Sequence, residues 1–402
     1  MRMIRAVAIM LTLTVTITLV GCVSYVDLSD RAIVQAIGID YLPDKKVYRI
    51  SMQYFNQSSE GGQNQIDKTQ DNVLKSVGEG ESIFAAAKNA SMLTGKDLLL
   101  SENRLIIIGK ELRKYKLGDT LEFFVGNYHS HPQAYVAAAE DTAEELLDIR
   151  FKEGSTSSQR LANLIHNASV ESRNKSTYPY QVMTMLCTST ESAFLPLLTT
   201  ATLKTDVTIP KETGGGKGNG GGEEQSEDGE KTIILDGGVV FKGGKELCRV
   251  DDDGAMAIFF MNDMPSEYSF TVPLGQNAKP SVMLIGVTRS IKATEYNGKV
   301  KFDVSFSASG KIGSKGGMKE DEKKAAEKVA EPAERELKRE IESSVIPIAE
   351  KGCDVFGLEN TLRRCCNRFY RENKDRVGEI IAESEIEVNV NIDIFSQGIG
   401  GA

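Results

Sequence analysis

The chain has 402 residues, of which 40% are hydrophobic and 26% charged, and its formal net charge is −9. This composition is typical of globular proteins, and the length suggests two or three domains. The acidic balance, without a clustered basic patch, excludes a nucleic-acid partner. After the N-terminal apolar run, no stretch has the length and polarity of a membrane span, which excludes a channel or a transporter.

The N-terminus has the layout of an export signal. Two arginines precede an apolar run, residues 6–20, which fits a signal h-region and is shorter than the about 20 residues that span a bilayer. The run ends on the sequence LVGC, residues 19–22, which resembles a bacterial lipobox. In such a motif the small Gly21 fits the peptidase pocket beside the scissile bond, and the thiol of Cys22 accepts diacylglycerol.

We therefore predict that residues 1–21 are a cleaved signal peptide and that Cys22 carries lipid. Two acyl chains give stable anchoring, whereas one binds membranes only marginally. The mature chain of 381 residues would be held on the outer face of the cell membrane, with a formal charge of −11 after loss of the two signal arginines. The alternative is an uncleaved signal anchor with an unmodified Cys22.

Residues 22–196 predict an N-terminal α+β domain in which strands and helices intermix. Residues 31–55 have the pattern of two strands around a Pro-Asp turn, which indicates a hairpin. A capping box, Thr142-x-x-Glu145, starts the last predicted helix. Between them, hydrophobic periodicity predicts further helices and strands, namely helix 82–96, strand 104–109, helix 117–128, strand 134–140 and helix 142–149.

Residues 197–279 predict a small β-rich domain, because their apolar runs read as strands without clear helices. The predicted strands are 199–209, 232–241 and 255–262. Residues 213–231 are rich in glycine and acidic residues, so we expect a flexible, disordered loop that connects two strands of a hairpin. A linker between domains is the alternative interpretation of this loop.

Residues 280–402 predict a C-terminal α+β domain with an antiparallel sheet plus helices. Two strand patterns are separated by Asn297-Gly298, a strong hairpin signal because both residues tolerate positive φ. A helical pattern over 320–352 is interrupted at Pro332, where we expect a kink or a restart. The remaining predictions are a helix at 357–375 and an amphipathic strand at 384–395.

Residues that could carry chemistry form no recognisable constellation. The glycine-rich loop lacks the Gly-Lys-Ser/Thr of a phosphate loop. The sequence DDDG, residues 251–254, has no later bidentate carboxylate of a calcium loop, so a surface turn between strands is expected. Three histidines, His129, His131 and His166, lack Glu or Cys partners at zinc-ligand spacing. We predict no catalytic residues, no metal and no cofactor.

Five cysteines besides Cys22 have an odd count and no regular spacing, which argues against a disulfide framework. Cys365 and Cys366 are adjacent on a predicted helix and point about 100° apart, so they cannot serve one site and are expected to be structural thiols. The five are Cys187, Cys248, Cys353, Cys365 and Cys366.

A series of sequence blocks resembles the Ger(x)C family, the lipoprotein C subunits of spore germinant receptors. The match follows the family's order along the mature chain. Three features depart from the family pattern: the chain has no tryptophan, Asn103 stands where histidine is common, and the glycine-rich loop is long. The blocks are DRAIVQAIGIDY, LSENRLIIIGKEL, ESAFLPLL, LDGGVVFKGGKEL and GCDVFGLENTLRR with SEIEVNVNIDIFSQG.

The resemblance implies three domains of mixed α/β type on the outer surface of the inner spore membrane. It also implies integral-membrane A and B subunits as partners and a response to small nutrient germinants. Cys22 is the residue that receives a defined chemical role, lipidation. Five further motif positions are expected to serve the fold or an interface, namely Arg31, Gly38, Asp40, Asp354 and Gly357.

A solute-binding lipoprotein of an importer is the alternative function, since it would share the lipid anchor. Such a protein should show repeated βαβ units around a hinge and aromatic residues that grip the ligand. The chain has 7% aromatic residues and no tryptophan, and its final region is predicted to be rich in hairpins.

Overall fold

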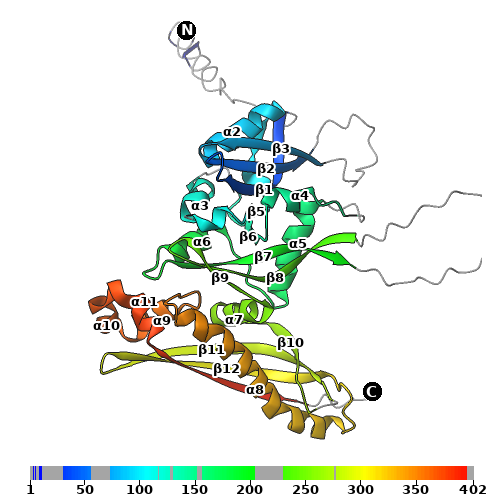
Figure 1. Cartoon of the computed structure of the whole chain (residues 1–402), viewed down its shortest axis with the longest axis vertical. Helices are drawn as coiled ribbons and strands as arrows, with labels where there is room; N and C mark the ends of the chain where they lie inside the picture. The colour runs from blue at the N-terminus through cyan, green and yellow to red at the C-terminus, as the bar shows by residue number, and fades with distance from the viewer. Residues whose placement is uncertain are drawn as a thin grey trace, which may run out of the picture.

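The computed structural model describes residues 3, 5, 9, 10, 30–55, 73–115, 117–126, 130–151, 156–203, 230–275 and 278–395. These residues form an elongated molecule with a nine-stranded sheet toward one end and a four-stranded sheet toward the other (Figure 1). Six of the eleven pairings between the described strands are antiparallel. The predicted α+β class with mainly antiparallel sheets is confirmed. In the described part of the chain, no helix has the length and apolar character needed to cross a membrane.

The nine-stranded sheet has parallel strands at its centre and antiparallel strands on both sides. The predicted hairpin of residues 31–55 is confirmed as the pair β1–β2. The strand order is β3-β2-β1-β5-β6-β7-β8-β9, and β4 pairs with β1 outside this path. The strands are β1 (Arg31–Leu42), β2 (Val47–Phe55), β3 (Val73–Gly80), β4 (Asp97–Leu99), β5 (Leu105–Ile108), β6 (Tyr135–Ala139), β7 (Ser192–Leu203), β8 (Glu230–Lys242) and β9 (Lys245–Val250).

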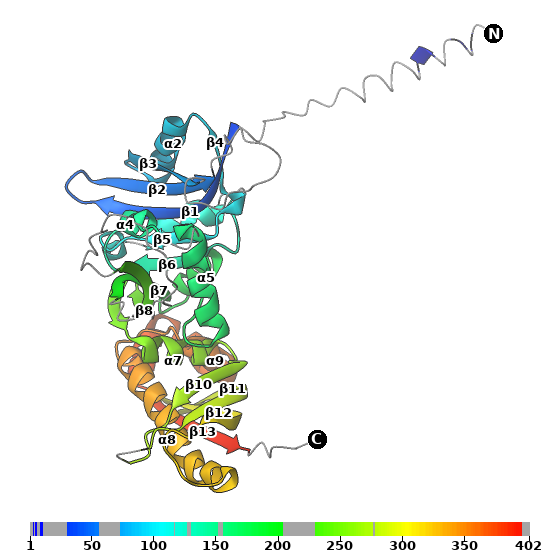
Figure 2. The same ribbon diagram turned by 90° about the vertical axis from the view of Figure 1, so that its right-hand side faces the viewer.

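Helices cover both faces of this sheet (Figure 2). Because side chains alternate along a strand, β5 sends Ile106 and Ile108 into one core cluster and Leu105 and Ile107 into the other. The first cluster lies under α2 (Ile83–Thr94), α3 (Leu117–Gly126) and α6 (Pro179–Leu186), and the second under α4 (Ala143–Asp148) and α5 (Ser157–Val170). Two short 3₁₀ helices complete this part, η3 (Leu100–Glu102) and η4 (Leu112–Lys114).

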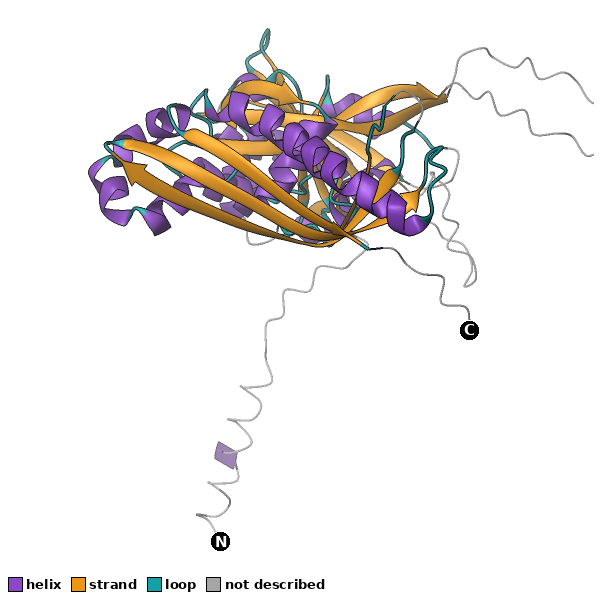
Figure 3. Cartoon of the chain, turned by 90° about the horizontal axis from the view of Figure 1, so that it is seen from below, coloured by secondary structure: helices purple, strands orange, loops and turns teal. Residues whose placement is uncertain are grey.

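The four-stranded sheet packs one face against the long helix α8 (Glu322–Ala349), which runs along it (Figure 3). Asn297 and Gly298 have φ values of +52° and +80°, which confirms the predicted hairpin. The strands are β10 (Glu267–Thr271), β11 (Ser281–Tyr296), β12 (Lys299–Ser314) and β13 (Glu385–Ile394). The remaining helices are α9 (Leu358–Cys365), α10 (Asn367–Glu372), η5 (Lys374–Arg376) and α11 (Val377–Ala382).

One prediction for this region is wrong, and one of the two outcomes expected at Pro332, the restart, does not occur. β13 pairs with β12 in parallel, not antiparallel, because the chain returns across the sheet through α8 to α11 before it enters β13, and such a crossover makes neighbours parallel. α8 does not restart at Pro332. It continues through Pro332 and Pro347, while its apolar face stays buried against the sheet.

Residues 255–262 form part of a helix, and the strand predicted there is wrong. α7 (Asp252–Asn262) begins after Asp251, whose side chain accepts a hydrogen bond from the N–H of Gly254 at 2.9 Å. The expected turn at 251–254 is therefore a helix N-terminus. Every residue from Ala255 to Met261 is buried, so the run shows no periodicity that separates helix from strand.

α7 lies between the two sheets (Figure 1). Its side chains share one core cluster with Phe194 and Val240 of the nine-stranded sheet and with Val282 and Phe306 of the four-stranded sheet. Residues 197–279 accordingly contribute to both sheets: the described part supplies β8, β9 and the end of β7 to the first, and β10 to the second.

Candidate functional site

Two of the motif residues, Gly38 and Asp40 in β1, hold the start of α4. The carboxylate of Asp40 accepts hydrogen bonds from the backbone N–H groups of Ala143 (2.8 Å) and Glu144 (3.1 Å). Burial raises the pKa of Asp40, and these two hydrogen bonds oppose the rise. A Cβ atom at Gly38 would lie 2.9 Å from that of Ala143. Both residues are buried and position a helix.

Two other motif residues, Asp354 and Gly357, shape the start of α9. The carboxylate of Asp354 accepts hydrogen bonds from the N–H groups of Phe356 (3.0 Å), Leu358 (2.9 Å) and Glu359 (2.7 Å). Gly357 has a φ of +78°, which glycine adopts without strain. Burial raises the pKa of Asp354, against the effect of the three N–H donors. Asp354 is therefore a helix cap whose carboxylate is turned inward.

This cap also links the start of α9 to the nine-stranded sheet. The N–H of Asp354 donates to the hydroxyl of Ser192 in β7 at 3.0 Å. Glu359 is buried, and its Oε1 accepts hydrogen bonds from the N–H of Ser189 (3.1 Å) and the hydroxyl of Tyr370 (3.0 Å). We call these contacts between residues 354–359 and residues 189–192 the junction.

An ion pair links the nine-stranded-sheet part to the end of α7, and a backbone-bound amide lies beside it within that part. Lys175, 7% exposed, donates to Asp263 at 2.6 Å just after α7. The Nδ2 of Asn174 donates to the carbonyl of Gly237 at 2.7 Å. A cavity of about 380 Å³ lies beside these contacts and is lined by Leu164, Asn167, Ala168, Glu171, Arg173, Asn174, Ile234, Leu235, Asp252, Asp253, Met256 and Tyr268.

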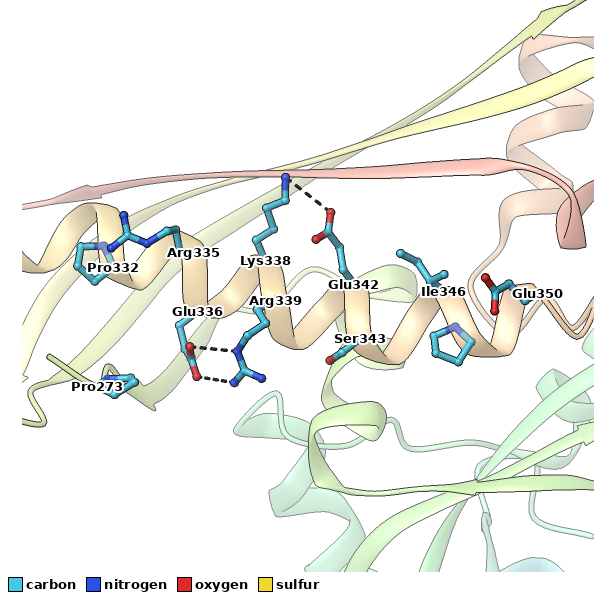
Figure 4. A pocket seen from close by; sticks show the side chains of 11 residues that line it. Pro273, Pro332, Arg335, Glu336, Lys338, Arg339, Glu342, Ser343, Ile346 and Glu350 are labelled. Atoms are coloured by element: carbon cyan, nitrogen blue, oxygen red, sulfur yellow. Dashed lines mark hydrogen bonds and ion pairs between the residues drawn. The ribbon is translucent and has the colours of Figure 1, made fainter. Parts of the chain in front are cut away.

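A larger groove, about 900 Å³, runs along α8 (Figure 4). Its charged side chains pair within the helix: Glu336 with Arg339 at 2.6 Å and Lys338 with Glu342 at 3.6 Å. Pro273 lies on the opposite side of the groove from Glu336 and Arg339 (Figure 4). Because positive and negative side chains both line this groove and pair with each other, the groove favours neither an anionic nor a cationic ligand.

The remaining predicted positions are dispersed. Arg31 is half-buried at the start of β1, opposite Asp97 in the β1–β4 register. The structure therefore brings Gly38 together with Asp40, and Asp354 together with Gly357, but it leaves Arg31 at the other end of its strand. Cys22, His129 and the glycine-rich loop up to residue 229 lie outside the described residues.

The two described histidines make separate contacts. His131 Nδ1 accepts from the N–H of Gln133 at 3.1 Å, and His166 Nδ1 lies 3.0 Å from the hydroxyl of Tyr135. Across the part of the chain that the structure describes, no group of three or more His, Cys, Asp or Glu side chains is arranged to hold a metal ion.

The five described cysteines are free thiols. Cys353 is buried, and burial raises its pKa to about 11. Cys365 is exposed, whereas the half-buried Cys366 directs its thiol at the carbonyl of Ala293 at 3.5 Å. The adjacent pair therefore occupies two different environments.

Sequence reasoning missed the partners in the junction. Ser189, Ser192 and Glu359 carry ordinary polar side chains whose significance depends on contacts between distant segments. One signal was available, because Ser192 and Asp354 each lie in one of the quoted blocks, ESAFLPLL and GCDVFGLENTLRR.

Comparison with known proteins places these features in a family. A family model described as "Spore germination protein N-terminal domain" matches residues 24–200, and one described as "Spore germination B3/GerAC like, C-terminal" matches residues 236–398. No curated protein sequence matches the chain. A solved structure titled "Crystal Structure of the GerBC protein" superposes with a TM-score of 0.55 at 12% identity, covering 89% of this chain and 96% of that one. At this identity the likeness concerns the fold.

Proposed function

Because the chain belongs to the GerAC family of spore germination proteins, we propose that it is the lipid-anchored C subunit of a spore germinant receptor. In this role it assembles with integral-membrane A and B subunits on the outer surface of the inner spore membrane. The observation that carries the proposal is the match of two family models to successive segments of one chain, which agrees with the order of the sequence blocks.

The lipid anchor is supported by the sequence LVGC at residues 19–22, which follows an apolar run of signal length. Diacylglycerol on Cys22 would confine the protein to the plane of the membrane. Confinement raises the effective concentration of the protein for partners in that plane.

A role in assembly, without catalysis, is supported by the contacts of the motif residues. Asp40 and Asp354 use their carboxylates to cap helices, and His131 and His166 make separate local contacts. We expect spores that carry His131→Ala or His166→Ala to release dipicolinate in response to a germinant nearly as wild-type spores do. Loss of release in either variant, with the complex still assembled, would support an enzyme instead.

Palmitate labelling tests the anchor. Cys22→Ala should abolish labelling and leave the signal uncut, which shifts the protein on a gel. The matched control is Cys187→Ala, which removes an exposed thiol elsewhere and should leave labelling unchanged. Labelling that persists in Cys22→Ala would contradict the anchor.

A pull-down tests the assembly. The protein is captured from detergent-solubilised spore membranes, and we expect two polytopic membrane proteins to come with it. Recovery of the chain without polytopic proteins would contradict the receptor-subunit proposal, and recovery of an ATP-driven importer would support the solute-binding alternative.

A further inference from the structure

Helix α2 presents an unusual amount of apolar surface to solvent. Phe84, Met92 and Leu93 are 65%, 71% and 76% exposed. Among the described residues from Asp30 onward, the only other large apolar side chain exposed to this degree is Met264, at 65%. We call Phe84, Met92 and Leu93 the α2 patch. Single exposed apolar residues are normal, whereas a group on one helix marks an interaction site.

The fold of the domain does not use this patch. The opposite side of α2 buries Ile83 and three alanines, Ala86, Ala87 and Ala90, against the nine-stranded sheet. At about 100° per residue, Phe84 and Met92 lie about 80° apart around the helix and Leu93 lies about 180° from Phe84, so the three side chains span the solvent-exposed side of α2 from one flank to the other. The patch is therefore available to a partner without any change in the core.

The position of α2 identifies that partner. The helix ends at Thr94 with Gly95 as its C-cap, and the chain then forms β4, which pairs in parallel with Arg31–Ile33 at the start of β1. The α2 patch thus lies at the end of the molecule where the chain enters the fold, and the four-stranded sheet lies at the other end (Figures 1 and 2). Seven residues, 23–29, separate Cys22 from Asp30, so a lipid on Cys22 holds this end within about 30 Å of the bilayer.

We propose that the α2 patch rests on the lipid bilayer and inserts its apolar side chains at the boundary between headgroups and acyl chains. The inference rests on the lipid anchor of the proposed function. The charges around the patch balance: Lys88, which lies between Phe84 and Met92 on the helix, and Lys96 are matched by Glu81 and Asp97. Apolar insertion therefore drives the contact, and anionic lipid is not required.

This contact fixes the orientation of the protein. With α2 on the membrane, the long axis of the molecule stands away from the bilayer, and α8 with its sheet is held at the far end (Figure 1). A single flexible tether would leave the orientation free, whereas a tether combined with an inserted helix restricts it.

The absence of tryptophan from the chain makes the inference directly measurable. Phe84→Trp and Met264→Trp each introduce a single fluorophore at a site of equal exposure, 65%. The mature chain, with an N-terminal hexahistidine in place of Cys22, is bound to phosphatidylcholine vesicles that contain a nickel-chelating lipid. Acyl chains brominated near the headgroup should quench the Phe84→Trp protein about twofold and shift its emission to the blue. The Met264→Trp protein should be unaffected.

Equal emission of the Phe84→Trp protein with and without bromine would overturn the inference, as would equal quenching at both sites. If Phe84→Trp lowers the melting temperature, Leu93→Trp replaces it, because that side chain is also exposed and outside the core. The nickel tether replaces the lipid on Cys22, so this result is independent of palmitate labelling. A failure of lipidation and a failure of docking are therefore seen in different experiments.

Discussion

The backbone N–H of Asp354 lies 3.0 Å from the hydroxyl oxygen of Ser192. The two residues belong to segments matched by different family models, and the carboxylate of the same aspartate caps α9 through three N–H groups. One residue therefore stabilises both the start of α9 and its contact with the nine-stranded sheet.

Asp354→Ala should lower the free energy of unfolding by about 3 kcal/mol, because several N–H groups lose their charged acceptor. Asp354→Asn keeps one acceptor oxygen and should cost less. Chemical denaturation measures both. Asp375→Ala removes an exposed aspartate of η5 and is the control. A loss equal to that of the control would show that the cap contributes nothing.

Gly38→Ala should destabilise the protein by about 1–3 kcal/mol, since the added methyl would lie 2.9 Å from the Cβ of Ala143. Gly126→Ala, at the end of α3, has no atom within 4 Å of the added group, so its stability should not fall. Thermal melts of the two variants make the comparison. An unchanged melting temperature for Gly38→Ala would mean that α4 can move away from β1 without loss of stability.

Lys175→Ala should cost about 2 kcal/mol, because it removes a charged hydrogen bond to the half-exposed Asp263, 2.6 Å away. Arg173→Ala breaks an exposed pair with Glu171 and should cost less than about 1 kcal/mol. Denaturant titration of both variants at low salt gives the difference. Equal losses of stability in the two variants would show that the Lys175–Asp263 pair contributes no more than an exposed pair.

Glu340 on α8 makes stability depend on pH. Burial, followed by the nearby Asp253 and Glu336, raises its pKa from 4.5 to about 7, and Arg339 opposes the rise. The folded state therefore binds more protons than the unfolded chain between these values, so the free energy of unfolding should fall as pH rises from about 4.5 to about 7.

Glu340→Gln removes this titration and should be the more stable protein above that range. Denaturation series across pH for wild type and variant test it, with Glu327→Gln, an exposed position on the same helix, as the control. A pH slope that is identical in wild type and Glu340→Gln would assign the dependence to other groups.

Much of the N-terminal sheet could be predicted from the sequence because its signals are local. The capping residue Thr142 and the terminal Gly95 of α2 act within one turn of their own helices. The hairpin at Asn297-Gly298 also depends on adjacent residues. Such signals do not depend on contacts with distant residues, so they can be recognised from the sequence alone.

The wrong predictions concern elements that tertiary contacts determine. α7 is buried on all sides between the sheets, so its apolar run carries no period. The parallel position of β13 depends on the path of the preceding helices, and the junction depends on segments more than 150 residues apart. Neither kind of information is present in a short window of sequence.

The pairing of β7 with β8 limits where the chain can be divided into separately folding pieces. The first family model ends at residue 200 and the second begins at residue 236, yet these strands pair across the gap, from Ser192↔Lys242 to Leu203↔Glu230. Cutting the chain there would separate β7 from β8 and leave each piece with an unpaired strand edge, and such edges template aggregation. A shortened N-terminal piece made for expression must therefore keep β8 and β9 with β7, so it has to extend to Val250 and not stop at the limit of the first family model.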